Sequence, residues 1–257
     1  MKASSSKHIE ASLPEDIALK IVSSLPVLDV CSLGSCSRFW RELCGSDSVW
    51  AFLCKDRWPA LKDSSASEIK AHELHPQIDS LKGWKGLYIS KHNEMAARST
   101  IVVNFVKQCS PTESIEVGHY LAAIEILWSM QFGFKDVQMF LLKPNLDVLL
   151  NLVGLHYCIN WLEVPAECLI EALNSCKIEG RKVRVQWWKL GRWSYGFRLQ
   201  DETHSRNISL EDFAMAKEEE VLGVLRRGAI YEVRRVQISV AKPTRTLWSC
   251  QTSQAPT

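Results

Sequence analysis

Apolar residues near the start of the chain recur with the spacing of an α-helix. Ile17, Ile21 and Leu25 stand four residues apart, so they fall on one stripe of a helix that can face a partner surface. Pro14 suits the first turn, because its missing N–H would have no helical partner there. Pro26 cannot continue the helix. The pattern therefore predicts a helix between these two prolines.

Three more short amphipathic stretches follow, at residues 28–33, 37–44 and 46–58. Four short helices then fit into fewer than fifty residues. A bundle of this size buries little surface alone and leaves apolar residues exposed at its leading edge. The pattern predicts that the segment docks on another protein, although spacing alone does not identify that protein.

Residues of this segment follow a known family pattern in order and spacing. They are Leu13-Pro14-Glu15-Asp16-Ile17, Ile21, Leu25-Pro26, Asp29-Val30, Cys36-Ser37-Arg38, Trp40-Arg41-Glu42-Leu43 and Val49-Trp50. The segment from about residue 10 to 58 resembles an F-box, and plant-type F-box proteins look most similar. Cys36 stands where the family often has valine, and Gly34 weakens its helix by up to about 1 kcal/mol relative to alanine.

The resemblance implies a substrate receptor of a ubiquitin ligase. F-box bundles bind the Skp adaptor, which links them to a cullin, a RING subunit and a ubiquitin-charged conjugating enzyme. Catalysis of ubiquitin transfer then belongs to these partners, and the chain itself is expected to be no enzyme. The positions expected to contact the adaptor, or to support the contacting helices, are Leu13, Pro14, Ile17, Ile21, Leu25, Pro26, Leu33, Cys36, Trp40, Leu43 and Trp50.

The rest of the chain predicts a mixture of helices and strands. Helical periodicity returns at residues 84–109, residues 119–142 and 146–162 are apolar enough to be helix or buried strand, and Pro165 begins a further helix. Ser209 can cap a helix that runs to about Arg226, and a strand is expected from Tyr231 to Val240.

An antiparallel hairpin is predicted at residues 183–199. Val183, Val185 and Trp187 alternate with polar residues, and a second alternation places Trp193, Tyr195, Phe197 and Leu199 on one apolar face. Trp188 should then lie on the opposite face, near Arg184 and Arg198. Because Trp and Arg are enriched in binding hot spots, our hypothesis is that Trp188, Arg184 and Arg198 contribute to recognition of a protein substrate.

These elements give an α+β fold with an N-terminal F-box bundle and a small antiparallel sheet near the C-terminus. The expected organisation is a disordered tail at residues 1–12, the F-box at 13–59, a helical linker at 60–100, an α+β substrate-recognition domain at 101–241 and a disordered tail at 242–257.

A second function stays open for the segment from residue 177 to 198. It holds seven basic residues, one acidic residue and five aromatics, a combination that can stack on bases and contact phosphates. Aromatic residues of such a hairpin are more often buried, so nucleic-acid binding is the less favoured alternative.

Composition excludes some other classes of function. A net charge of +2 is too small for the whole protein to bind nucleic acid or an anionic membrane by electrostatic attraction. The sequence has no apolar run of membrane-spanning length, no signal-peptide pattern and no motif for a metal or cofactor. Nine cysteines, an odd number inside apolar patterns, indicate reduced thiols and a cytoplasmic or nuclear location.

Overall fold

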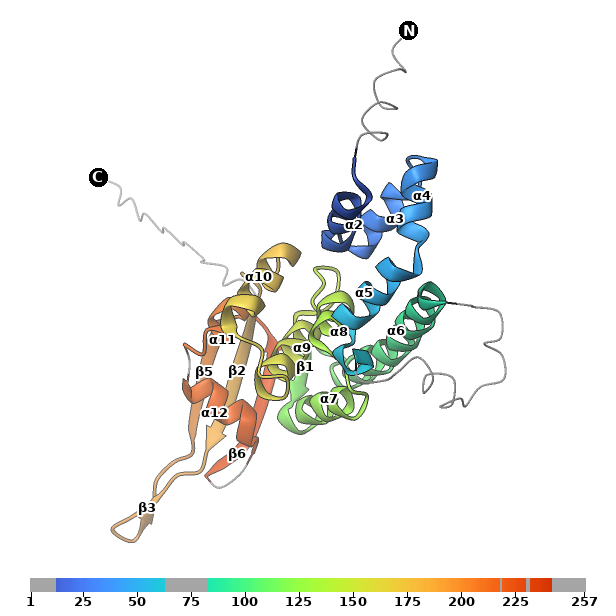
Figure 1. Ribbon diagram of the computed structural model, residues 1–257. Helices are drawn as coiled ribbons and strands as arrows, with labels where there is room; N and C mark the ends of the chain where they lie inside the picture. Colours follow the sequence, from blue (N-terminus) through green and yellow to red (C-terminus); the bar gives the residue numbers. More distant parts are fainter. Residues whose placement is uncertain (1–12, 63–82, 218, 230–231, 242–257) are drawn as a thin grey trace, which may run out of the picture. The chain divides into compact units, whose positions relative to one another are not determined.

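The computed structural model describes residues 13–62, 83–217, 219–229 and 232–241. Both predicted disordered tails, and residues 63–82 of the predicted linker, lie outside these ranges. Contacts divide the chain into two units. The first comprises residues 1–101 and 132–136, and the second comprises residues 102–131 and 137–257. The predicted α+β class, with an N-terminal helical bundle and a small antiparallel sheet, is confirmed (Figure 1).

The first unit is helical. Its elements are α2 (Glu15–Ser24), α3 (Val27–Leu33), α4 (Arg38–Gly45), α5 (Asp47–Arg57), the short 3-10 helix η1 (Pro59–Lys62) and the start of α6 (Trp84–Cys109). Pro14 and Pro26 precede α2 and α3 with extended backbones. Pro14 therefore lies just before the first turn, where the sequence placed it, and Pro26 both ends the preceding segment, as predicted, and stands before the next helix. Ser37 caps α4, because its hydroxyl accepts a hydrogen bond from the Trp40 N–H.

One apolar cluster holds these helices together. Trp50 lies at its centre, and the indole N–H donates to the carbonyl of Cys44 at 2.8 Å. Tyr88 of α6 packs edge-on against Trp50, with ring centroids 5.4 Å apart. The other buried members are Ala18, Val22, Val30, Leu43, Cys44, Val49, Leu53 and Cys54.

A buried charge pair closes the other side of the same unit. Arg57, at the end of α5, donates a hydrogen bond from Nε to Oδ1 of Asp136 at 2.9 Å, and its Nη2 forms an ion pair with the same oxygen at 2.7 Å. Trp58 Nε1 donates to the second oxygen of Asp136, and Arg57 also bonds to the Tyr88 hydroxyl. A buried pair is tolerated only when its atoms are hydrogen-bonded, and here both carboxylate oxygens have partners.

The second unit combines a sheet with helices. The helices are α7 (Val117–Ser129), the end of α8 (Phe134–Phe140), α9 (Val148–Asn160), α10 (Ala166–Cys176), α11 (Leu210–Ala214) and α12 (Glu219–Arg227). The strands are β1 (Ser114–Glu116), β2 (Lys182–Lys189), β3 (Trp193–Ser194), β4 (Phe197–Arg198), β5 (Glu202–Ser209) and β6 (Val233–Val240). Residues 119–142 and 146–162, which the sequence left open between helix and strand, are helical.

The sheet has four antiparallel strands in the order β1-β6-β2-β5. Val183, Val185 and Trp187 of β2 are buried on one face, where α9 and α11 contact the strands. The intervening residues of β2 point to the opposite face, as the pleat requires. The sheet is therefore covered by helices on one side (Figure 1).

Helix α9 forms the core of this unit. Residues 148–158 are all buried, which fits a helix that is apolar around its whole circumference. Its polar members have partners: Asn151 donates to the carbonyl of Leu141 at 2.7 Å, and His156 Nδ1 lies 2.8 Å from the Tyr120 hydroxyl.

The predicted hairpin at residues 183–199 is wrong in its second strand. Strand β2 pairs with β5, at residues 202–209, instead of with residues 193–199. Those residues lie in the connection and form the two-stranded ribbon β3–β4. The expected apolar face is absent from the described structure, because Trp193, Tyr195, Phe197 and Leu199 are all exposed.

The predicted helix from Ser209 to Arg226 is interrupted. Ser209 does cap α11, since its hydroxyl accepts from the Asp212 N–H, but α11 ends at Ala214. Ala216 has a positive φ of 52°, which a continuing right-handed helix does not allow. A second helix, α12, begins at Glu219.

Candidate docking surfaces

Helix α2 has two neighbouring rows of apolar residues, one buried and one exposed. Ala18 and Val22 are fully buried in the bundle. Ile17 and Ile21, one position earlier in each turn, remain 39% and 40% exposed. A small helix that leaves isoleucines uncovered beside its buried row carries a surface suited to a protein partner.

The predicted adaptor positions separate into three groups by exposure. Pro14, Ile17, Ile21, Pro26 and Cys36 are exposed. Leu13, Leu25, Leu33 and Trp40 are half-buried. Leu43 and Trp50 are buried in the core of the bundle. Exposed positions can touch a partner directly, whereas Leu43 and Trp50 can act only by holding the helices in place.

Leu28 was not among the predicted adaptor positions. It lies in the first turn of α3 and is 81% exposed, the largest value of any apolar residue in the described part of the bundle. The sequence carried part of this signal, because Leu28 and Val30 are apolar residues two positions apart in one short stretch. In the structure Val30 is the one that is fully buried. Two apolar residues two positions apart on a helix point in different directions, so one of them had to be uncovered.

The second surface is the face of the sheet that no described helix of the second unit covers. Arg184 and Trp188 of β2 lie on this face, as predicted, together with Arg235 of β6. The Arg235 guanidinium lies over the Trp188 ring, 5.2 Å from its centroid, and also bonds to Glu116 through Nε at 2.9 Å. Trp188 is consequently half-buried, and Arg235 is the arginine beside it.

Arg198 lies elsewhere. It belongs to β4 of the small ribbon and pairs with Asp201 at 2.8 Å. The expectation that it stands near Trp188 on the same sheet face is wrong, because it followed from pairing β2 with residues 193–199. Arg184 donates instead to Asn207 of the neighbouring strand β5 at 3.2 Å.

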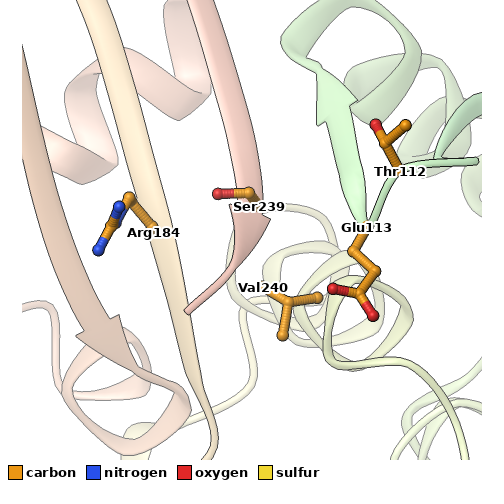
Figure 2. A pocket seen from close by; sticks show the side chains of 5 residues that line it. All are labelled: Thr112, Glu113, Arg184, Ser239 and Val240. Atoms are coloured by element: carbon orange, nitrogen blue, oxygen red, sulfur yellow. The ribbon is translucent and has the colours of Figure 1, made fainter. Parts of the chain in front are cut away.

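A shallow pocket opens at one end of this sheet face. Thr112, Glu113, Arg184, Ser239 and Val240 line a volume of about 250 Å³. Figure 2 shows Arg184 and Ser239 on neighbouring strands, with Glu113 just before β1. Small-molecule sites commonly enclose roughly 300–1,000 Å³ with mostly apolar walls. This pocket is smaller, and four of the five side chains that line it are polar or charged.

The cations of residues 177–198 are largely engaged within the chain. Lys189 pairs with Glu220 and Arg192 with Glu232, at 3.2 and 3.0 Å. Arg181 donates to the Leu146 carbonyl at 2.7 Å. The counter-charges reduce the positive potential that the sequence suggests, so this segment is poorly suited to holding a phosphate backbone.

Within the described ranges, no helix is long and apolar enough to cross a membrane. The same ranges contain no group of three or more His, Cys, Asp or Glu side chains placed to hold a metal ion.

Comparisons with known proteins agree with the N-terminal part of this description. A family model described as F-box-like matches residues 11–56, so the predicted F-box is confirmed. F-box only protein 24 from human, mouse and Macaca fascicularis is 34% identical to this chain over 53 residues. The aligned part covers 21% of this chain and only 9% of each relative. The expected similarity to plant-type proteins stays a prediction. No solved structure matches the chain.

Proposed function

We propose that this chain is a substrate-recognition subunit of a Skp-cullin-F-box type ubiquitin ligase. Its F-box-like domain at residues 11–56 docks on the Skp adaptor, and its second unit binds the protein to be ubiquitinated. The single observation that supports docking most strongly is the exposed apolar row of Ile17 and Ile21 beside a fully packed bundle. The chain contributes no catalytic group, and it acts where the ligase acts, in the cytoplasm or nucleus.

In this proposal the exposed and the buried residues of the docking surface have different roles. Ile17, Ile21 and Leu28 are apolar side chains that lose water when a partner covers them, at roughly 25 cal/mol per Å² of apolar surface. Leu43 of α4 and Trp50 of α5 belong to the same buried cluster as Ala18 and Val22 of α2, so they support the helices that carry the exposed residues. Exposed and buried positions should therefore respond differently to mutation.

Co-purification with the Skp adaptor and cullin tests the proposal. The double variant Ile17→Ser, Ile21→Ser should weaken adaptor binding at least tenfold, since it removes two apolar contacts without touching the core. Its thermal unfolding temperature should stay close to that of the unmodified chain, because both side chains are exposed already. Lys20→Ala, on the exposed side of the same helix, is the matched control and should bind normally.

Trp50→Ala serves as the opposite control. It should lower the free energy of unfolding by about 3–5 kcal/mol, the usual cost of removing a large aromatic from a core. Normal adaptor affinity of the Ile17→Ser, Ile21→Ser variant, or no binding by the intact chain, would remove the docking surface from α2.

The substrate half of the proposal rests on the sheet face and the pocket beside it. Arg184 and Trp188 supply the residue types that dominate protein-binding hot spots, and both are accessible. Nucleic-acid binding is less well supported, because Trp187 is fully buried and three cations of residues 177–198 are paired with carboxylates.

A further inference from the structure

The connection between β2 and β5 displays apolar side chains that the fold does not use. Residues 190–200, here called the aromatic ribbon, extend from the end of the four-stranded sheet (Figure 1). Trp193, Tyr195 and Phe197 are 75%, 100% and 77% exposed, and Leu199 is 55% exposed. Soluble proteins rarely gather large apolar residues on a protruding segment without a partner that covers them.

The backbone of the aromatic ribbon is held in place at its base. The Gly191 N–H donates to the Asp201 carboxylate at 2.9 Å, and the Leu199 N–H donates to the Arg192 carbonyl at the same distance. The two arms lie so close that a Cβ on Gly191 would be 1.8 Å from the Leu199 carbonyl oxygen. Preformed elements lose less conformational entropy when they bind, so a ribbon of this kind is suited to recognition.

The turn at the tip carries a residue that the turn itself disfavours. Tyr195 and Gly196 occupy its two central positions with φ angles of 49° and 85°. Glycine and asparagine adopt such angles easily, whereas a bulky side chain there is strained. Because the Tyr195 side chain is fully exposed, packing of this side chain does not stabilise the folded state. A strained residue without a folding role indicates a functional one.

The charges around the aromatic ribbon favour one class of partner. Arg192 and Arg198 are paired with Glu232 and Asp201, so the ribbon offers aromatic surface with little uncompensated positive charge. Phosphate polymers and anionic membranes attract free cations. An apolar pocket on a folded protein is complementary to a neutral, convex group of aromatic rings. Tyrosine and tryptophan also provide large contact areas at a low entropic cost.

We propose that the aromatic ribbon inserts Trp193, Tyr195 and Phe197 into an apolar pocket on a folded protein, and that this protein is the substrate. The proposal rests on the receptor function proposed above and adds the element that anchors the substrate. Arg184 and Trp188 would then contribute the polar part of the same interface from the sheet.

A photo-crosslinker at the tip provides the first test. p-Benzoylphenylalanine replaces Tyr195 in the full chain, which is expressed with the proteasome inhibited, and the same amino acid replaces Ser129 on α7 in a control. The expected result is a discrete protein crosslinked from position 195 and absent from position 129. No crosslinked protein at position 195, or the same protein from both positions, would overturn the proposal.

The crosslinked protein is then purified, and its affinity for variants of the full chain is measured. Trp193→Ser with Phe197→Thr should weaken binding roughly 30-fold or more, the effect of losing hot-spot residues. Trp128→Ser, which removes a 56% exposed aromatic from α7, should leave the affinity unchanged. Equal losses in both variants would contradict an anchoring role of the ribbon.

Tyr195→Asn separates binding from folding. Asparagine accepts the φ of position 195, so the thermal unfolding temperature should stay the same or rise while affinity for the crosslinked protein falls. A fall in the unfolding temperature would make Tyr195 a structural residue and overturn its assignment.

Two further measurements identify the alternatives. Binding to vesicles of phosphatidylcholine and phosphatidylserine that disappears in the Trp193→Ser, Phe197→Thr variant would overturn the proposal in favour of a membrane contact. Adaptor binding of the same variant should be normal. Loss of substrate affinity with intact adaptor binding supports both functions, whereas substrate binding by a chain that does not bind the adaptor would refute only the ligase role.

Discussion

His156 is a neutral histidine in the core of the second unit. Burial, together with the nearby positive charge of Arg226, lowers the pKa of His156 to about 3. The imidazole stacks on Tyr120, with ring centroids 5.6 Å apart, and meets Phe213 edge-on at 5.5 Å. His156 stands in the apolar segment 146–162, so its burial follows from the sequence pattern, but the partner Tyr120 comes from another helix and could not be named in advance.

The lowered pKa of His156 predicts a loss of stability in mild acid. The unfolded chain binds a proton at a pKa of about 6.5 and the folded chain only near 3, so stability falls as the pH drops below 6.5. At pH 5 the loss due to this one group should be about 2 kcal/mol relative to pH 7. Chemical denaturation at both pH values measures it.

The variant His156→Gln isolates this effect. Glutamine cannot take up the proton, so the variant should be less stable than the unmodified chain at pH 7 but should lose less stability between pH 7 and pH 5. Groups other than His156 contribute equally to both proteins. Parallel pH dependence in the two proteins would show that His156 does not titrate on unfolding.

At the scale of elements, sequence patterns predicted helices better than strand partners. The limits of α2 to α5 follow from Pro14, Pro26, Ser37 and the apolar spacing between them, which are local signals. The partner of β2 is not a local property. Residues 193–199 alternate as a strand should, yet the edge position beside β2 belongs to residues 202–209, whose outer residues are polar.

Local sequence patterns also predicted only part of the candidate site on the sheet. Arg184 and Trp188 could be placed on one face because successive residues of a strand alternate. Arg235, which stacks on Trp188, comes from a strand more than forty residues later in the chain. Residue spacing requires that one of Leu28 and Val30 is uncovered, but which of the two it is, and the exposure of the aromatic ribbon, depend on how the helices and strands pack.

Close packing between α8 and α9 depends on one glycine. A Cβ at Gly154 would lie 3.0 Å from Val137 Cγ1 and 3.1 Å from Leu141 Cβ. Gly154→Ala should therefore lower the free energy of unfolding by about 1–2 kcal/mol, because the cost of overpacking exceeds the gain in helix propensity.

Gly223 of α12 is the matched position for this test. A Cβ there meets nothing within 4 Å, so Gly223→Ala should raise stability by about 0.5–1 kcal/mol. Denaturant unfolding of the two variants should give shifts of opposite sign. Stabilisation by both substitutions would mean that α8 and α9 adjust at little cost.

At the scale of the whole molecule, the two units are not two consecutive segments of the sequence. Residues 132–136 belong to the first unit although the sequence on both sides of them belongs to the second. The carboxylate of Asp136 is what neutralises the buried Arg57. The predicted domain limits stay predictions. They divide the chain into consecutive segments, so they do not predict that Asp136, far along the sequence, contacts a residue of the F-box helices.

The buried pair should be essential to the stability of the first unit. Asp136→Asn removes the carboxylate that forms the ion pair with the buried Arg57 and should lower the free energy of unfolding by about 3–5 kcal/mol. Lys135→Ala, at the neighbouring residue, breaks an exposed ion pair with Asp56 and should cost no more than about 1 kcal/mol. Equal effects in denaturation would mean that the Arg57–Asp136 pair contributes no more than a surface contact.

A fragment ending at residue 101 lacks the carboxylate and should be destabilised in the same way.

The position of β6 in the sheet constrains how the protein can be made in a cell. Strand β1 pairs only with β6 in the described sheet, and Ser114 lies opposite Ser239. Strand β6 is the common neighbour of β1 and β2, and it is synthesised last of the three. Because a ribosome adds about 5–20 residues per second, β1 stays unpaired for roughly 6–25 seconds. One edge of β2 also stays unpaired until β6 is made. During this interval the nascent chain has unpaired strand edges, which are sites of aggregation. The second unit should therefore complete its sheet only after β6 has been synthesised, and should depend on chaperones until then.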